Sequence, residues 1–203
     1  MRDEASGLYR LSGPAEDLDF LQGKTPPDAD GPLFLLQTEI SSIYKRQGKV
    51  RKVHNLIFVP TLDDADRLSQ RLELVGNLHS DGRPILGLDS RDLLEMTLDV
   101  CPGAVLVPAH VWTPWFALFG SKSGFDRLED CFDDLSSHIF ALETGLSSDP
   151  GMNRMVSRLD GYALISNSDA HSPSKLGREA TLFSCPPGFS ALKRAIETGA
   201  GLD

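Results

Sequence analysis

The sequence predicts an α/β fold in which short buried strands alternate with helices. The composition is that of an ordinary globular chain, with 40% hydrophobic and 24% charged residues. Short apolar segments of strand length are bounded by turn residues, and segments with apolar residues at helical spacing lie between them. This alternation is typical of parallel βαβ units, and therefore of a parallel sheet or a barrel.

The first two predicted strands cover residues 33–40 and 50–60. The second is rich in β-branched side chains, which favour an extended backbone. Between them, Gln47 and Gly48 suit a tight hairpin turn. We therefore expect the two strands to be antiparallel neighbours.

Two helices are predicted after this hairpin, at 63–76 and 92–100. Gly76 supplies a stop signal for the first, and Asp89 or Ser90 can cap the start of the second.

The rest of the chain continues the alternation. Short apolar segments between turn signals predict buried strands at 104–108, 139–142 and 162–166. Helices are expected around 153–159, between the last two strands, and at 189–197.

Two regions differ in composition. Residues 1–31 are acidic and contain several glycines and prolines, which predicts a poorly ordered lead-in. Residues 32–203 hold all of the principal strands and helices and contain no obvious linker or internal repeat. We expect them to form one domain.

Charge and cysteine content exclude several classes of protein. The chain has 20 basic and 29 acidic residues and a formal net charge of −9, which excludes a generally basic nucleic-acid-coating protein but not a local basic patch. Its three cysteines are far apart, which argues against a disulfide framework or a cysteine zinc site. The sequence has neither a membrane-spanning apolar stretch nor a signal peptide, so we expect a cytoplasmic protein.

Polar residues suited to metal binding lie in or directly after the predicted strands. In a parallel barrel the carboxyl ends of all strands open on one face, where active sites are built. The residues in question are Glu39, His54, His110, Glu143, Asp169 and His171.

The pair Asp169 and His171 is the most specific of these signals. Residues two apart in an extended chain point the same way, so both side chains can face one point. Carboxylate and imidazole together suit Zn²⁺ or Mn²⁺, and a set without thiolates favours a catalytic over a structural site. Asn167, Ser168 and Ser172 are candidate donors around this pair.

Each of these residues also has an ordinary structural interpretation. A single histidine at a strand end often bonds a backbone carbonyl, and Glu39 could cap a helix or belong to an ion pair. Their occurrence on successive strands is what favours the metal site. His79 and His138 lie in polar contexts and are expected at the surface.

Residues 45–52, which we call the basic run, carry five positive charges just before His54 and are a candidate for binding a phosphate backbone. The alternative interpretation is that these charges are simply solvated at the tip of a hairpin. Aromatic residues after His110 could stack on a base or simply cap the barrel, and Lys122 lies in a loop of small residues that could meet a phosphate. The predicted substrate-binding residues are Lys45, Arg46, Lys49, Arg51, Lys52, Trp112, Trp115 and Lys122.

These residues and their surroundings resemble the polymerase-and-histidinol-phosphatase (PHP) superfamily of metal-dependent phosphoesterases, and more narrowly the endonuclease Q family of DNA-repair enzymes. The resemblance covers most of the chain from about residue 34 to residue 183. It is carried by TEISSIYKRQGKVRKVHNLIF, GRPILGLDSRDLLE, VPAHVWTPWFALFGSKSGFD, IFALETGLSSDPGMN and LISNSDAHSPSKLGREA.

The resemblance implies a distorted (β/α)7 barrel that holds divalent metal ions (Zn, Mn or Mg), two or three in a complete family member. It implies cleavage of DNA 5′ of a deaminated base. Glu143 inherits only a place at the rim of the active site. The implied metal ligands are Glu39, His54, His110, Asp169 and His171, and Asp169 and His171 are also expected to be catalytic.

The sequence also departs from the family pattern. PHP proteins begin with a strand that ends in His-x-His, whereas the first histidine of this chain is His54. The cysteine zinc site of the family's C-terminal extension is missing too. The resemblance therefore implies an incomplete PHP-type barrel that lacks its first strands, with a partial domain over 32–203 taken from the middle of a longer protein.

The leading hypothesis is an endonuclease that acts on DNA with deaminated bases. Asp169 would orient the attacking water, and the lesion base would lie against the loop of Trp112 and Trp115. A second hypothesis is a PHP phosphatase that acts on a small phosphomonoester, against which the basic run argues mildly. A third is a catalytically inactive fragment, supported by the missing His-x-His.

Overall fold

The computed structural model describes residues 6–10, 32–79 and 84–202. The strands are β1 (Leu36–Arg46), β2 (Lys49–Val59), β3 (Ile85–Leu86), β4 (Val105–Pro108), β5 (Ala141–Glu143) and β6 (Ala163–Ile165). The helices are α1 (Leu62–Glu73), α2 (Ser90–Val100), α3 (Leu128–Phe132), α4 (Pro150–Arg154) and α5 (Phe189–Thr198). Short 3₁₀ turns lie at Asp133–His138, Ser157–Leu159 and Pro173–Lys175.

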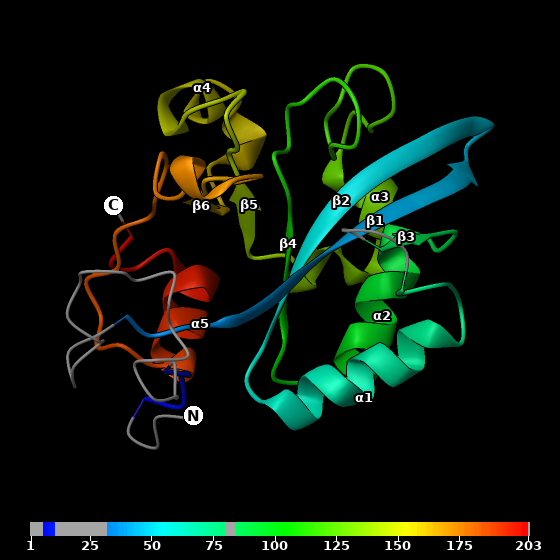
Figure 1. Cartoon of the computed structure of the whole chain (residues 1–203). Coiled ribbons are helices and arrows are strands. Elements are labelled where there is room, and N and C mark those ends of the chain that lie inside the picture. Colours follow the sequence, from blue (N-terminus) through cyan, green and yellow to red (C-terminus); the bar gives the residue numbers. More distant parts are fainter. Residues whose placement is uncertain (1–5, 11–31, 80–83, 203) are drawn as a thin grey trace.

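The fold is mixed α/β and contains two sheets (Figure 1). One has four strands in the order β3-β1-β2-β4, and the other consists of β5 and β6. Just after β4, the N–H of Val111 donates to the carbonyl oxygen of Glu143 at the end of β5, at 3.0 Å. This bond joins the end of the larger sheet to the end of the smaller one.

The long hairpin of β1 and β2 confirms the predicted antiparallel pair. The two strands pair along their whole length, from Leu36 opposite Val59 to Arg46 opposite Lys49. Gln47 and Gly48 have φ angles of 53° and 73°, both in the left-handed region that such a two-residue turn requires. The hairpin is therefore specified locally, by the turn and by the alternation of its side chains.

The larger sheet separates two hydrophobic clusters. Ile40, Val53 and Ile57 lie on the face that α1 and α2 cover, in one cluster with the leucines of those helices. Leu56 and Phe58, which alternate with these residues, belong to the second cluster with β5, β6 and α5. The second face is the one that carries the functional side chains.

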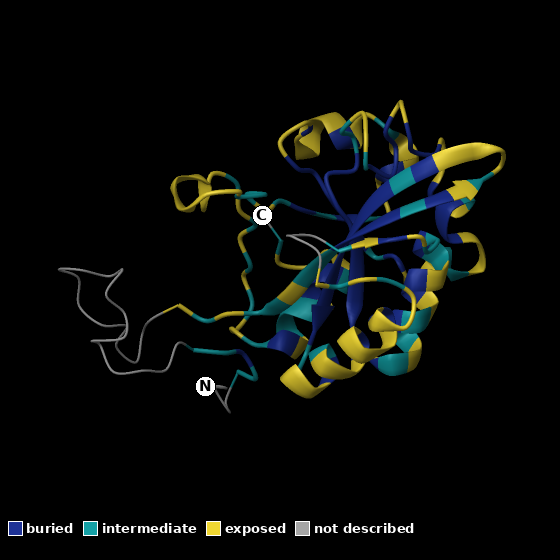
Figure 2. Ribbon diagram, turned by 45° about the vertical axis from the view of Figure 1, so that its right-hand side comes forward, coloured by how far each residue is buried: buried dark blue, intermediate teal, exposed yellow. Residues whose placement is uncertain are grey.

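The helices begin and end where local chemistry places them. Thr61 caps α1 by accepting the N–H of Asp64 at 3.0 Å, and Leu68 and Leu72 bury one face of this helix while the other stays exposed (Figure 2). At the end of α5, Gly199 has a φ of 70°, the left-handed conformation that commonly ends a helix.

Strand β2 departs from the parallel βαβ pattern that was expected for the rest of the chain. This strand runs antiparallel to both of its neighbours, β1 and β4, whereas β3 is parallel to β1 and β6 is parallel to β5. A two-residue turn permits only antiparallel pairing, so the hairpin interrupts the βαβ pattern. As a result, His54 reaches the site from the middle of its strand and not from the carboxyl end.

The other differences are local. The helix expected at 153–159 is α4 at Pro150–Arg154 followed by a separate 3₁₀ turn, because Asp149 caps the earlier start and Pro150 suits the first turn. Strand β3 and helix α3 were not predicted, since both are very short. The predicted lead-in over 1–31 lies outside the described residues except at 6–10, where Tyr9 pairs with Phe34.

Among the residues that the structure describes, no helix has the length and apolar character required to cross a membrane.

The hairpin turn yields a test of the register on which the site depends. Replacing Gly48 with alanine should lower the free energy of unfolding by about 1 kcal/mol, because φ is 73° there. No atom lies within 4 Å of the added Cβ, so backbone strain is the whole cost. Urea unfolding measures the effect. Gly161→Ala is the control, since that Cβ also meets nothing and φ is not in the left-handed region; equal losses in both variants would contradict the assigned turn.

Candidate metal centre

Three side chains from three neighbouring segments converge on one point. Glu39 lies on β1 and His54 on β2, and the register places Glu39 opposite Leu56 and Ser41 opposite His54. Alternation along both strands therefore puts Glu39 and His54 on the same face of the sheet. His110 joins them from the segment directly after β4. We call Glu39, His54 and His110 the triad.

The donor atoms of the triad lie close enough to share one metal ion. His54 Nδ1 is 3.0 Å from Glu39 Oε1 and 3.0 Å from His110 Nε2, and His110 Nε2 is 3.5 Å from Glu39 Oε1. Ligand atoms bound to one ion at about 2.0–2.2 Å are roughly 2.8–3.6 Å apart in tetrahedral or octahedral geometry. The triad is thus a donor group of the kind that holds a divalent metal ion.

Thr113 sets the tautomer of His110. The hydroxyl of Thr113 lies 3.2 Å from the carbonyl oxygen of His110 and 2.9 Å from that of Trp115. Carbonyl oxygens only accept, so the hydroxyl donates its single proton to them. Its oxygen therefore accepts the Nδ1–H of His110, at 2.9 Å. The lone pair of His110 Nε2 then faces the triad, as a metal ligand requires.

The backbone at His110 is held in an uncommon conformation. Its φ is 30°, and its N–H donates to Glu143 Oε2 at 2.7 Å. The other oxygen of Glu143 accepts from Asn167 at 3.0 Å, so one buried carboxylate connects the ends of β4, β5 and β6. Gly145 packs against His110 so closely that a Cβ there would collide with it.

The charges around His110 favour a cation. Burial alone would lower the pKa of His110, but the nearby carboxylate of Glu39, assisted by Glu143 and Asp169, raises it above the usual value. Burial raises the pKa of Glu143, and its hydrogen bonds from His110 and Asn167 offset part of that effect. The same negative potential that stabilises a protonated imidazole would stabilise a bound metal ion.

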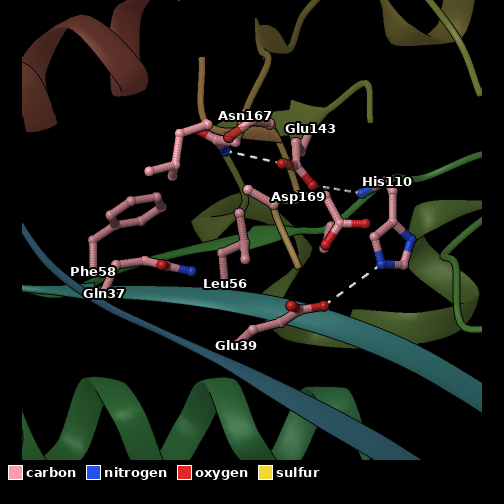
Figure 3. Close-up of a pocket in the computed structure, with 12 residues that line it drawn as sticks. Gln37, Glu39, Leu56, Phe58, His110, Glu143, Asn167 and Asp169 are labelled. Carbon is pink, nitrogen blue, oxygen red and sulfur yellow. Dashed lines mark hydrogen bonds and ion pairs between the residues drawn. The ribbon is translucent and has the colours of Figure 1, made fainter. Parts of the chain in front are cut away.

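A cavity of about 320 Å³ opens beside the triad. Asp169 enters it from the loop after β6, and its carboxylate points toward His110 (Figure 3). Leu56 and Phe58 form an apolar wall below, with Asn167 on the opposite side. Three of the five predicted metal ligands, Glu39, His110 and Asp169, thus line one cavity, and His54 contacts the first two beside it.

His171 lies outside the cavity, with its Nδ1 3.7 Å from Asp169 Oδ1. Its side chain is 74% exposed, it does not line the cavity, and its Nδ1 contacts the carbonyl oxygen of Asp169 at 2.9 Å. Its roles as a ligand and catalytic residue stay predictions. Ser168 and Asn167 do line the cavity, and Glu143 supports His110 by accepting its backbone N–H.

Two arginines of the predicted basic run are engaged in internal contacts. Arg46 donates to the carbonyl oxygen of Cys131 at 3.1 Å and pairs with Asp89 and Asp133. Arg51 is buried, donates to the carbonyl oxygen of Gly124 and lies over the ring of Phe125. Both guanidinium groups therefore attach the hairpin to neighbouring segments, and this structural role explains the two arginines without invoking a bound substrate.

The lysines and one tryptophan of the predicted set are more accessible. Lys45, Lys49 and Lys122 are exposed. The ammonium group of Lys52 lies 5.1 Å from the ring centroid of half-exposed Trp115.

Trp112 differs from Trp115. Its Nε1–H donates to Asn153 Oδ1 at 2.8 Å and its ring packs beside Phe119, so this side chain braces its loop.

Sequence reasoning missed some residues of the site. Leu56 and Phe58 follow His54 at intervals of two on β2, so strand alternation alone could have identified this wall. Nothing in the sequence identifies Thr113 as the partner of His110, because that contact depends on the folded loop.

Comparisons with known proteins give partial matches. No protein-family model matches the chain. The chain is 39% identical over 130 residues to the uncharacterized protein YqxK of Bacillus subtilis, in an alignment that covers 63% of this chain and 32% of that protein. It is 41% identical over 96 residues to the uncharacterized protein MJ0043 of Methanocaldococcus jannaschii, covering 43% of this chain and 12% of that protein. The chain spans about a third and about an eighth of the length of these two relatives.

A solved structure from Bifidobacterium adolescentis, provisionally assigned as a metal-dependent phosphoesterase, also matches. The TM-score is 0.44 with 16% identity, over 80% of this chain and 75% of that one. At this level of similarity, neither fold nor function is transferred from it.

The triad predicts metal binding that depends on its three side chains. Isothermal titration with Mn²⁺ should give saturable binding to the intact chain, weakened by about 100-fold or more in His110→Ala because a ligand is lost. His79→Ala is the matched control, since that side chain is 84% exposed, pairs with Glu73 of α1 and does not belong to the triad. Equal affinity in His110→Ala and His79→Ala would contradict the assignment.

Proposed function

We propose that this chain carries the active site of a metal-dependent phosphodiesterase, a hydrolase of the endonuclease Q type that cuts DNA 5′ of a deaminated base. The observation that carries the proposal is the convergence of Glu39, His54 and His110 beside a cavity that Asp169 also enters. The motifs that resemble the endonuclease Q family support the choice of substrate.

The triad would hold the divalent ion of this reaction. Such an ion lowers the pKa of a bound water and offsets charge on a phosphoryl oxygen. Asp169, whose carboxylate points into the same cavity, orients the attacking water and accepts its proton. Leu56 and Phe58 exclude bulk water from one side, which strengthens the electrostatic interactions at the reacting phosphate.

The exposed lysines of the hairpin support a polymeric substrate. A rise of about 3.3 Å per residue places the backbone of Lys45 about 20 Å from that of Glu39, on the face of the hairpin that carries the triad. A small phosphomonoester bound at the triad would not reach this far, whereas a DNA strand would. Lys45 lies opposite Val50 near the tip of the hairpin, whereas Lys49 lies opposite Arg46 on the other face.

A phosphatase that acts on small phosphomonoesters is the second candidate. The number of cations in the basic run argues against a small substrate. Because Arg46 and Arg51 are engaged in internal contacts, that argument depends on the lysines alone. A cavity of about 320 Å³ is also large enough for a small ester.

Cleavage of an end-labelled DNA duplex with one deoxyinosine or deoxyuridine tests the proposal. With Mn²⁺ or Mg²⁺ we expect a cut 5′ of the lesion, and Asp169→Asn should lose at least about 100-fold in rate because the water is no longer oriented. A parallel assay with a chromogenic phosphomonoester measures the second candidate.

Replacement of Lys45 with alanine separates the two substrates. The ratio of DNA cleavage to ester hydrolysis should fall about threefold at moderate salt, because a phosphate contact far from the metal is lost. An unchanged ratio would favour the phosphatase. If neither substrate is hydrolysed, both candidates are contradicted and the hypothesis of a catalytically inactive fragment is left.

A further inference from the structure

The loop that delivers Asp169 lies largely at the surface. It leaves β6 after Ile165, and most of its residues from Asn167 to Ala180 are exposed or half-buried. Its base is closed by Thr181, whose hydroxyl accepts the N–H of Ser166 at 2.8 Å and donates to the carbonyl oxygen of Ser166 at 3.1 Å. Core packing does not hold the segment between these residues, so other contacts must position Asp169.

The backbone of Asp169 itself needs support. Its φ is 44°, in the left-handed region that residues other than glycine adopt uncommonly. Conformations of this kind persist where the surroundings hold them in place. In this conformation the carboxylate points toward His110 (Figure 3).

Arg178 bonds the backbone at this point. Its Nε–H donates to the carbonyl oxygen of Ser168 at 2.7 Å, and its Nη2 donates to the carbonyl oxygen of Asp169 at 3.2 Å. The planar guanidinium fork thus spans two successive peptide groups, a geometry that a lysine cannot reproduce. His171 adds a contact to the same Asp169 carbonyl at 2.9 Å.

We propose that Arg178 is a positioning residue that fixes the loop so that the carboxylate of Asp169 stays in the metal cavity. The inference rests on the proposed function, because it assigns Arg178 a role through Asp169. The hydrogen bonds of Arg178 go to backbone carbonyl oxygens, so the Asp169 carboxylate remains directed into the cavity. Arg178 is exposed, and its removal leaves both hydrophobic clusters intact.

A double-mutant cycle on Mn²⁺ affinity tests this role. Arg178→Ala should weaken Mn²⁺ binding about tenfold, in the range seen when residues that support ligands are removed. In an Asp169→Asn background the same change should have almost no further effect, because Arg178 acts through that carboxylate. Arg178→Lys should restore only part of the affinity. Arg194→Ala, at an exposed arginine of α5, is the matched control.

Two results of the cycle would overturn the proposal. One is unchanged Mn²⁺ affinity in Arg178→Ala, and the other is the same loss in both backgrounds, which would show an effect independent of Asp169.

Hydrogen exchange separates this proposal from the proposed function. In the absence of metal, the amides of residues 167–170 should exchange faster in Arg178→Ala than in Arg194→Ala. Unchanged exchange overturns the role of Arg178, even if the triad binds metal. Faster exchange in a chain whose triad binds no Mn²⁺ would support the fixing of the loop while contradicting the proposed function.

Discussion

The metal centre depends on the register of the β1–β2 hairpin. Glu39 and His54 share a face only because Ser41 lies opposite His54, and a slip of one residue would turn one of the two side chains to the face covered by α1 and α2. The turn at Gln47 and Gly48 fixes this register, and the burial of Ile40, Val53 and Ile57 on the opposite face holds it. The same interaction therefore builds the core and aligns two ligands.

The remaining parts of the site are held by polar contacts at the ends of short strands. Glu143 accepts one hydrogen bond from the backbone of His110 and one from Asn167, and so ties the loops after β4 and β6 to β5. Both His110 and Asp169 have a positive φ, so two residues of the cavity have backbones that need external support. Because Glu143 is buried, losing either hydrogen bond would leave a carboxylate oxygen without a partner and would cost free energy of folding, so these contacts are maintained.

The sequence predicts the elements that depend on local signals and misses those that depend on tertiary contacts. The hairpin, α1, α2, β4 and α5 were predictable, because turn residues, caps and periodic leucines lie within each segment. The sequence analysis grouped Glu39, His54 and His110 because parallel strands end on one face, whereas Glu39 and His54 meet through the register of an antiparallel pair. The internal roles of Arg46 and Arg51 were not predictable, because their partners Cys131 and Gly124 are distant in sequence. The orientation of His110 depends likewise on a folded loop and on Glu143.

The most direct test of the metal centre is the anomalous diffraction of a crystal soaked in Mn²⁺. The account predicts a peak about 2.0–2.2 Å from Glu39 Oε1, His54 Nδ1 and His110 Nε2, with the three donors in nearly their present positions. A crystal in which Mn²⁺ binds elsewhere, with His54 and His110 joined by a simple hydrogen bond, would contradict it.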